Sequence, residues 1–139
     1  MSDPISQPEY MLLFRGSMLD KGLSPQALQD VMTRWKAWYD GLVSDGRAVS
    51  GRPLGAEGRV VTGRGGRHVA DGPFAESKEA VGGYFMLHVA DFDEAVEIAR
   101  QCPGLDYGLA VEVRQVRERC VALEAAEKGE REELATSRA

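Results

Sequence analysis

The sequence has little of what marks secreted or membrane proteins. It contains only two cysteines, Cys102 and Cys120, which form neither a CxxC pair nor a disulfide framework. Its longest apolar runs, at residues 10–14 and 84–87, are far shorter than the roughly 20 residues that a membrane span requires. The first residues hold neither a basic region nor an apolar stretch, so we expect no secretory signal. These absences favour a cytoplasmic protein without membrane contact.

Basic residues are also scarce, since 17 lysines and arginines face 22 acidic residues and leave a net charge of -5. A protein that coats the phosphate backbone of nucleic acid usually has the opposite balance, so we expect no direct nucleic-acid binding. The hydrophobic content of 43% is ordinary for a folded chain. A length of 139 residues suits one compact domain rather than two.

Changes in composition divide the chain into three parts. Residues 1–8 contain Pro4 and Pro8 and no apolar periodicity, which predicts a flexible leader. Residues 118–139 are dense in charge and predict a helical C-terminal extension that lies outside the core. The globular domain is therefore expected at residues 9–117.

The apolar pattern within this domain predicts its strands and helices. The run at 10–14 is apolar on both faces, which is typical of a central strand. Ser24 and Pro25 mark a helix start, and Asp91 with Glu94 forms a capping box before a second helix at 92–101. Further strands are expected at 47–54, 59–62, 68–70, 84–89 and 109–117. The first helix carries one apolar stripe that we expect to be buried: Leu28, Val31, Met32, Trp35, Trp38, Tyr39, Leu42 and Val43.

The resulting order, β-α-β-β(-β)-α-β, is the split βαβ pattern of α+β ferredoxin-like folds. Such a fold has an antiparallel sheet with both helices on one face, and it leaves the other face bare. Because a large apolar surface is rarely left in water, we expect two chains to pack face to face as a homodimer. A cleft between the two sheets would then hold a small-molecule ligand.

One segment is distinctive: DGPFAESKE at residues 71–79, followed by GGYF at 82–85. It resembles the DGPF signature of the YCII-related family of small bacterial proteins. The YMLL run at 10–13, the helix with Trp35, the Cys102-Pro103 pair and EVR at 112–114 are also similar to that family. The resemblance covers about residues 9–117.

This resemblance implies a ferredoxin-like, dimeric α+β barrel whose activity is largely unassigned. Some members are encoded beside, or fused to, sigma factors, which makes a sigma factor a candidate partner. A few members use a His–Asp pair for lyase or dehydrohalogenation chemistry, and their histidine lies in the N-terminal part. Here no histidine precedes His68, so the resemblance supplies no catalytic histidine at that place.

Asp71 and His88 are the candidate catalytic residues. Asp71 begins the DGPF turn, where an aspartate commonly accepts backbone N–H bonds, and its alternative role is a base or ligand anchor at the cleft mouth. His88 shares a strand face with Tyr84 and is either a hydrogen-bonded core residue or, near an acid, a general acid–base group. His68 could pair with Asp71, although its loop position favours an exposed side chain.

The ligand-binding candidates belong to the polar face of the predicted sheet and to the segment after the DGPF turn. Arg114 would be buried in a dimer and would then need a partner, for which Glu112 and Glu76 are candidates. A structural ion pair across the dimer is one role for Arg114, and capture of an anion is the other. We expect residues 76–79 in one or two helical turns. The full set is Glu76, Lys78, Tyr84, Glu112 and Arg114.

No cofactor or metal is expected. The two histidines lie far apart without Cys or Asp at ligand spacing, and Gly63-Arg64-Gly65-Gly66 lacks the lysine and Ser/Thr of a P-loop. Two functions stay open. The first is a ligand-binding domain with modest acid–base chemistry by Asp71, His88, Glu76 and Arg114, and the second is a non-enzymatic regulatory module linked to sigma factors.

Overall fold

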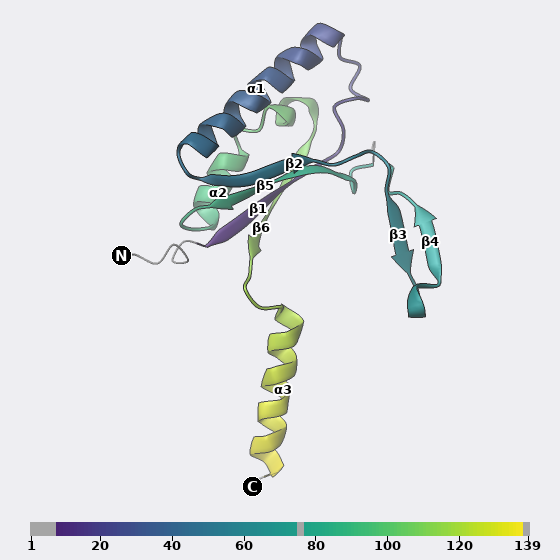
Figure 1. Ribbon diagram of the computed structural model, residues 1–139, viewed down its shortest axis with the longest axis vertical. Coiled ribbons are helices and arrows are strands. Elements are labelled where there is room, and N and C mark those ends of the chain that lie inside the picture. Colours follow the sequence, from purple (N-terminus) through teal and green to yellow (C-terminus); the bar gives the residue numbers. More distant parts are fainter. Residues whose placement is uncertain (1–7, 75–76, 138–139) are drawn as a thin grey trace.

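The computed structural model describes residues 8–74 and 77–137, which form a four-stranded sheet, a separate hairpin and three α-helices (Figure 1). Two short 3₁₀ turns, η2 and η3, connect other elements. In chain order the elements are β1 Glu9–Arg15, α1 Pro25–Ser44, β2 Ala48–Pro53, β3 Arg59–Thr62, η2 Arg64–Gly66, β4 His68–Asp71, β5 Val81–His88, α2 Phe92–Ala99, η3 Pro103–Tyr107, β6 Ala110–Val116 and α3 Val121–Ser137.

The four-stranded sheet has the order β2-β5-β1-β6, and every neighbouring pair is antiparallel. α1 and α2 lie on the same face of this sheet (Figure 1). With β3 and β4 set aside, the chain follows the split βαβ order of a ferredoxin-like fold. The expected α+β class is therefore confirmed, and β3–β4 is a hairpin inserted between the second and third strands of the sheet.

Both helices of the covered face begin where side-chain caps satisfy their first N–H groups. Ser24 Oγ accepts a hydrogen bond from the Ala27 N–H at 3.1 Å, and Pro25 occupies the first turn of α1. Asp91 Oδ1 accepts from the Glu94 N–H at 2.9 Å, while Glu94 Oε1 accepts from the Ala90 N–H at 2.9 Å. This reciprocal pair is the predicted capping box.

The core lies between the sheet and the two helices, and aromatic rings make up much of it. The ring of Phe14 lies 4.8 Å from Phe85, 4.9 Å from Trp35 and 5.9 Å from Trp38, in edge-to-face geometry. Leu12, next to this cluster on β1, is fully buried. Burial on this side comes from alternate residues of β1 and β5, as the period of two requires.

The apolar stripe of α1 is only partly buried, which corrects the sequence expectation. Val31 and Leu42 are buried, but Met32 and Val43 are 46% and 45% exposed. The stripe covers more of the helix circumference than the sheet can contact, so residues at its margins stay outside. Met32 borders a groove between α1 and the end of the sheet.

The strand that the sequence predicts at 84–89 begins earlier in the structure and includes two glycines. β5 begins at Val81 and includes Gly82 and Gly83. A Cβ on Gly83 would lie 3.0 Å from the carbonyl oxygen of Arg52 on the neighbouring strand, so close approach rather than a turn explains this glycine. Residues 77–79 form a bend and turn rather than the expected helical turns, and Glu76 lies outside the described residues.

Two arms extend from the sheet on the side opposite α1 and α2 (Figure 1). The β3–β4 hairpin leaves the sheet beside β2, where Val61 pairs with Val69, and these side chains are 61% and 64% exposed. α3 follows β6 and begins with Val121 and Leu123, which are 62% and 50% exposed. Along the described chain, no helix combines the length and apolar character that crossing a membrane requires.

Replacement of Gly51 by alanine should destabilise the domain, because a Cβ there would lie 2.7 Å from Phe85 Cδ1 and 3.0 Å from Tyr39 Cε1. Overpacking of this kind costs about 1–3 kcal/mol. Urea unfolding of Gly51→Ala should show a lowered midpoint, whereas Gly55→Ala, with nothing within 4 Å, should leave it nearly unchanged. Equal midpoints for the two variants would contradict this packing.

Candidate functional site

The uncovered face of the sheet, here called the open face, carries a half-buried apolar centre between polar ends. Leu13 lies between Tyr84 and Glu112 in the strand register, and Met11 lies between Met86 and Arg114. The apolar members of these rows are neither buried nor fully exposed. A surface of this kind is typical of a face that packs against another protein surface.

An ion-pair network holds one end of the open face. Glu112 accepts from Arg15 Nη1 at 2.8 Å through Oε1 and from Arg114 Nε at 2.5 Å through Oε2. Arg15 Nε also donates to the backbone oxygen of Lys78 at 3.1 Å. The hydrogen bond from Arg114, with the charges of Arg114 and Arg15, holds the pKa of Glu112 below its ordinary value of 4.5. Glu112 is therefore an ionised structural partner that joins β1 to β6.

Arg114 has its partner on its own strand, two residues away, and its side chain is 71% exposed. A hollow of about 370 Å³ at the outer edge of β6 is bordered by Arg114, Glu112 and Phe92. Lys78 contributes its backbone oxygen to the network, while its side chain is exposed. The structure thus brings Glu112, Arg114 and Tyr84 onto one face.

The other end of the open face carries a histidine–carboxylate pair. His88 Nε2 lies 3.2 Å from Glu9 Oε2, and the two residues are register partners on β5 and β1. Both side chains are partly exposed, at 35% and 43%. An imidazole beside a carboxylate has the components of a proton relay. Sequence reasoning missed Glu9, although its spacing of two from Met11 placed it on the same face.

Asp71 does not share this location. It ends β4 in the hairpin, is 78% exposed, and lies 3.3 Å from Arg59 Nε, its register partner on β3. The hairpin joins the sheet near Val81, whereas His88 is at the other end of β5. Within one chain the two catalytic candidates are therefore not brought together. His68 lies at the far end of β4 with an exposed side chain.

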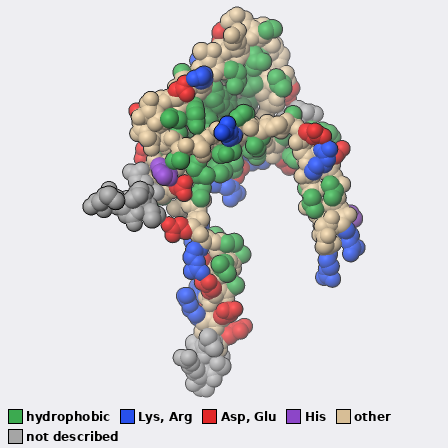
Figure 2. All heavy atoms as spheres, in the orientation of Figure 1, with side chains coloured by type: hydrophobic (Ala, Val, Ile, Leu, Met, Phe, Trp, Pro, Cys, Tyr) green, Lys and Arg blue, Asp and Glu red, His purple; other side chains and the backbone are tan. Residues whose placement is uncertain are grey.

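A large groove lies between α1 and the end of the sheet nearest the hairpin, far from the His88–Glu9 pair, while Pro73 and Gly58, close to Asp71, are among its lining residues. This groove, of about 980 Å³, runs between α1, the loop after β1 and the end of β2 and β5 nearest the hairpin. Hydrophobic side chains gather between α1 and the sheet edge in Figure 2. Five aromatic residues line it, among them the ligand-binding candidate Tyr84: Phe14, Trp35, Tyr39, Tyr84 and Phe85.

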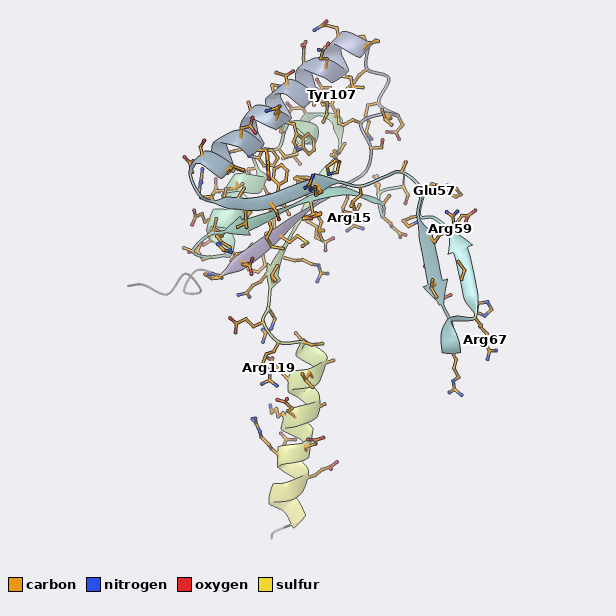
Figure 3. The ribbon with its side chains drawn as sticks, viewed as in Figure 1. Arg15, Glu57, Arg59, Arg67, Tyr107 and Arg119 are labelled. Carbon is orange, nitrogen blue, oxygen red and sulfur yellow. The ribbon has the colours of Figure 1, made fainter. Side chains whose placement is uncertain are left out.

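Few charges line the groove. Lys36 is bound to Asp40 at 2.6 Å, and Glu57 is bound to Arg59 at 2.8 Å. Figure 3 shows Glu57 and Arg59 together at the base of the hairpin. Arg52 borders the groove and is opposite Tyr84 in the strand register, and its side chain forms no hydrogen bond or ion pair with any residue in the described ranges. None of the described residues form a cluster of three or more potential metal ligands.

Comparison with known proteins places the chain in a family. The family model of the YCII-related domain matches residues 10–119, so the chain belongs to the YCII-related family. Its resemblance to that family, carried by the DGPF segment, is confirmed. No curated protein matches the chain.

Among solved structures, the chain is similar to 5-chloro-2-hydroxyhydroquinone dehydrochlorinase (TftG) from Burkholderia phenoliruptrix AC1100, in complex with 2,5-dihydroxybenzoquinone. The match covers 80% of this chain and 95% of that one, with 14% sequence identity and a TM-score of 0.48.

Replacement of Glu112 by glutamine should make the stability less dependent on pH. A carboxylate whose pKa is lowered by folding stabilises the native state above its unfolded pKa, and this contribution disappears as pH falls through the folded pKa. The gap between the urea midpoints of wild type and Glu112→Gln should therefore be largest near neutral pH and shrink below about 4.5.

Arg114→Gln is the companion variant, because it removes the main cause of the lowered pKa. When Glu112→Gln is introduced into Arg114→Gln, the urea midpoint at neutral pH should therefore change less than when Glu112→Gln is introduced into the wild type. A gap between wild type and Glu112→Gln that stays as large in acid as at neutral pH would contradict the network.

Proposed function

We propose that the protein binds a small, largely apolar molecule with one acidic group, and that the groove beside α1 is its binding site. The observation that carries this proposal is the groove itself, because its volume of about 980 Å³ falls in the range of ligand pockets and five aromatic rings line it. Apolar walls with a few placed polar groups are the usual design of such sites.

Arg52 is the proposed anchor for the acidic group. It lines the groove where β2 ends, and it has no partner among the described residues. A guanidinium presents several N–H donors in a fixed fork, which matches a carboxylate or sulfonate in two-point contact. Among the described residues that line the groove, Glu57 is the only one with a carboxylate, and it is already paired with Arg59 and would not repel an anion strongly.

Binding rather than acid–base chemistry is the proposed role of this groove. Proton transfer needs a titratable group within hydrogen-bond reach of the substrate. Glu57 is held in an ion pair, Asp71 is bound to Arg59, and the His88–Glu9 pair lies at the opposite end of β5. Lyase-type chemistry, which the family resemblance implied, is therefore left out of the proposal.

The proposal includes a homodimer that forms through the open face. Half-buried Met11, Leu13 and Met86 there would be covered by a second copy, while Glu112 with its two arginines would lie near the rim. Ion pairs at a rim contribute little affinity but favour one orientation of the partner. Association with a sigma factor stays a prediction without a structural feature that favours it.

Two fluorescent probes test the groove. The anionic probe 8-anilinonaphthalene-1-sulfonate and the neutral probe N-phenyl-1-naphthylamine should both bind to the native protein. Arg52→Ala should lower the affinity for the anionic probe about tenfold, because a charge-assisted hydrogen bond is lost. The affinity for the neutral probe should change by less than about twofold. Met32→Glu should weaken the binding of both probes, because it puts a charge beside the apolar lining of the groove.

Arg100→Ala is the matched control, since Arg100 is exposed at the end of α2 and does not line the groove. It should bind both probes like wild type. Circular dichroism verifies that each variant is folded. If Arg52→Ala lowered the affinity for both probes equally, Arg52 would not be the anchor for the acidic group. If Met32→Glu bound both probes like wild type, the groove would not be the binding site.

A further inference from the structure

The two edge strands of the four-stranded sheet, β2 and β6, differ in how well they resist pairing with another strand. β2 contains Pro53 and has an irregular register between Ala48 and Ser50, and both features hinder further pairing at an edge. β6 contains no proline or lysine, and its register with β1 is regular over all seven residues. β6 therefore lacks the backbone features that protect β2.

The backbone groups that β6 leaves unpaired follow from alternation. The Val89 N–H donates to the Pro8 carbonyl at 3.3 Å, which shows that even-numbered residues of β1 bond to β5. Odd-numbered residues of β1 therefore bond to β6, where their register partners are even-numbered. The N–H and C=O groups of Val111, Val113 and Gln115 point away from the sheet, and no described residue bonds to them. Such a row is a template for another strand.

The space beside this edge is open. The hollow of about 370 Å³ borders residues 112–115 and Phe92, which is the first residue of α2. The ring of Phe92 contacts Tyr10 at 5.1 Å on its inner side, yet the residue is 46% exposed. An exposed aromatic ring and a row of unpaired backbone groups therefore lie at the same place, which is typical of a surface that receives a partner.

The edge of β6 is complementary to the edge of a second copy. Two antiparallel β6 strands exchange hydrogen bonds only where outward-facing residues meet, so an odd-numbered residue must face an odd-numbered one. The register centred on Val113 fulfils this condition and is the one that pairs all seven residues, from Ala110 to Val116. In it Val113 faces Val113 of the partner subunit, and Val111 faces Gln115 of the partner subunit.

Charge selects the same register. With Val113 at the centre, Glu112 faces Arg114 of the partner subunit. The two neighbouring registers would instead place Glu112 opposite Glu112 or Arg114 opposite Arg114, and like charges in that position destabilise a sheet. Arg114 donates to Glu112 of its own chain through Nε, so its Nη nitrogens are left to donate to the partner subunit. Its side chain is 71% exposed and can reach across the edge.

We propose that β6 pairs in antiparallel fashion with β6 of a second copy, about a twofold axis at Val113. The two four-stranded sheets would then form one continuous sheet. α2 contacts both β6 and β1, so its axis would lie about one strand spacing, or ~5 Å, from the twofold axis. The two α2 helices would therefore be about 10 Å apart, which is a usual distance for packed helices. The Phe92 rings of both copies would lie near the axis.

This interface goes beyond the proposed function, because it uses neither the groove nor the open face. It would join two of the proposed homodimers edge to edge. The contact consists mainly of backbone hydrogen bonds and buries little apolar surface, so we expect it to form only well above micromolar concentration.

Amide hydrogen exchange with single-residue resolution tests the pairing. The amides of Val111, Val113 and Gln115 should exchange rapidly in dilute protein and at least about tenfold more slowly at near-millimolar concentration. The amides of Glu112 and Arg114, which bond to β1, should exchange slowly at both concentrations and serve as internal controls. Rapid exchange of the three outward-facing amides at both concentrations would overturn the inference.

Gln115→Pro tests the same interface by mutation. Proline removes an outward-facing N–H and is tolerated on an edge strand, whereas the matched control Gln115→Ala keeps that N–H. In sedimentation equilibrium at near-millimolar concentration, wild type and Gln115→Ala should reach about twice the particle mass of Gln115→Pro. Circular dichroism verifies that both variants are folded. Equal masses for Gln115→Pro and wild type would contradict the pairing.

The outcome is separate from that of the proposed function. Gln115 does not line the groove, so Gln115→Pro should bind both fluorescent probes like wild type. If the probes bind and the edge does not pair, the ligand site stands and the β6 interface is refuted. If the edge pairs and the probes do not bind, the β6 interface stands and the ligand site is refuted.

Discussion

The protein depends on a sheet that is covered on one face only. α1 and α2 bury alternate residues of β1 and β5, so that Leu12 and Leu87 are completely removed from water. The intervening residues Met11, Leu13 and Met86 point to the opposite face and are only half-buried. Burial of apolar surface is the main driving force of folding, so this asymmetry leaves part of that driving force unused in a single chain.

This constraint separates the polar residues from the ligand site. Charged side chains on the open face are largely bound to one another, as in the contacts of Glu112 with Arg15 and Arg114. The groove beside α1 is mostly apolar, and the side chain of Arg52, which borders it, has no partner among the described residues. Polar residues that the sequence suggests for a site, such as Glu112 and Arg114, thus form structural ion pairs. The proposed ligand groove is lined mainly by aromatic and other apolar residues, which the sequence pattern assigns to the core.

The fold could be predicted from the sequence because its signals are local. The caps at Ser24 and Asp91 and the alternation along β1 fix elements without reference to the rest of the chain. The capping box and the order of the strands were correct for this reason. The sequence placed the start of β5 too late, because the purpose of Gly83, close contact with β2, depends on a neighbour that is distant in sequence.

The candidate site could be predicted only in part, because it depends on register and on the space between elements. Alternation placed Glu112, Arg114, Tyr84 and His88 on one face, but it could not pair His88 with Glu9 or place Asp71 in a separate hairpin. No local pattern indicates a groove, which arises from the way α1 meets the end of the sheet.

Sedimentation equilibrium of the full-length protein at micromolar concentration tests most directly whether the open face is shared between two copies. The account predicts a particle of about twice the chain mass of 15.2 kDa. A particle with the mass of a single chain, unchanged as concentration rises, would contradict it.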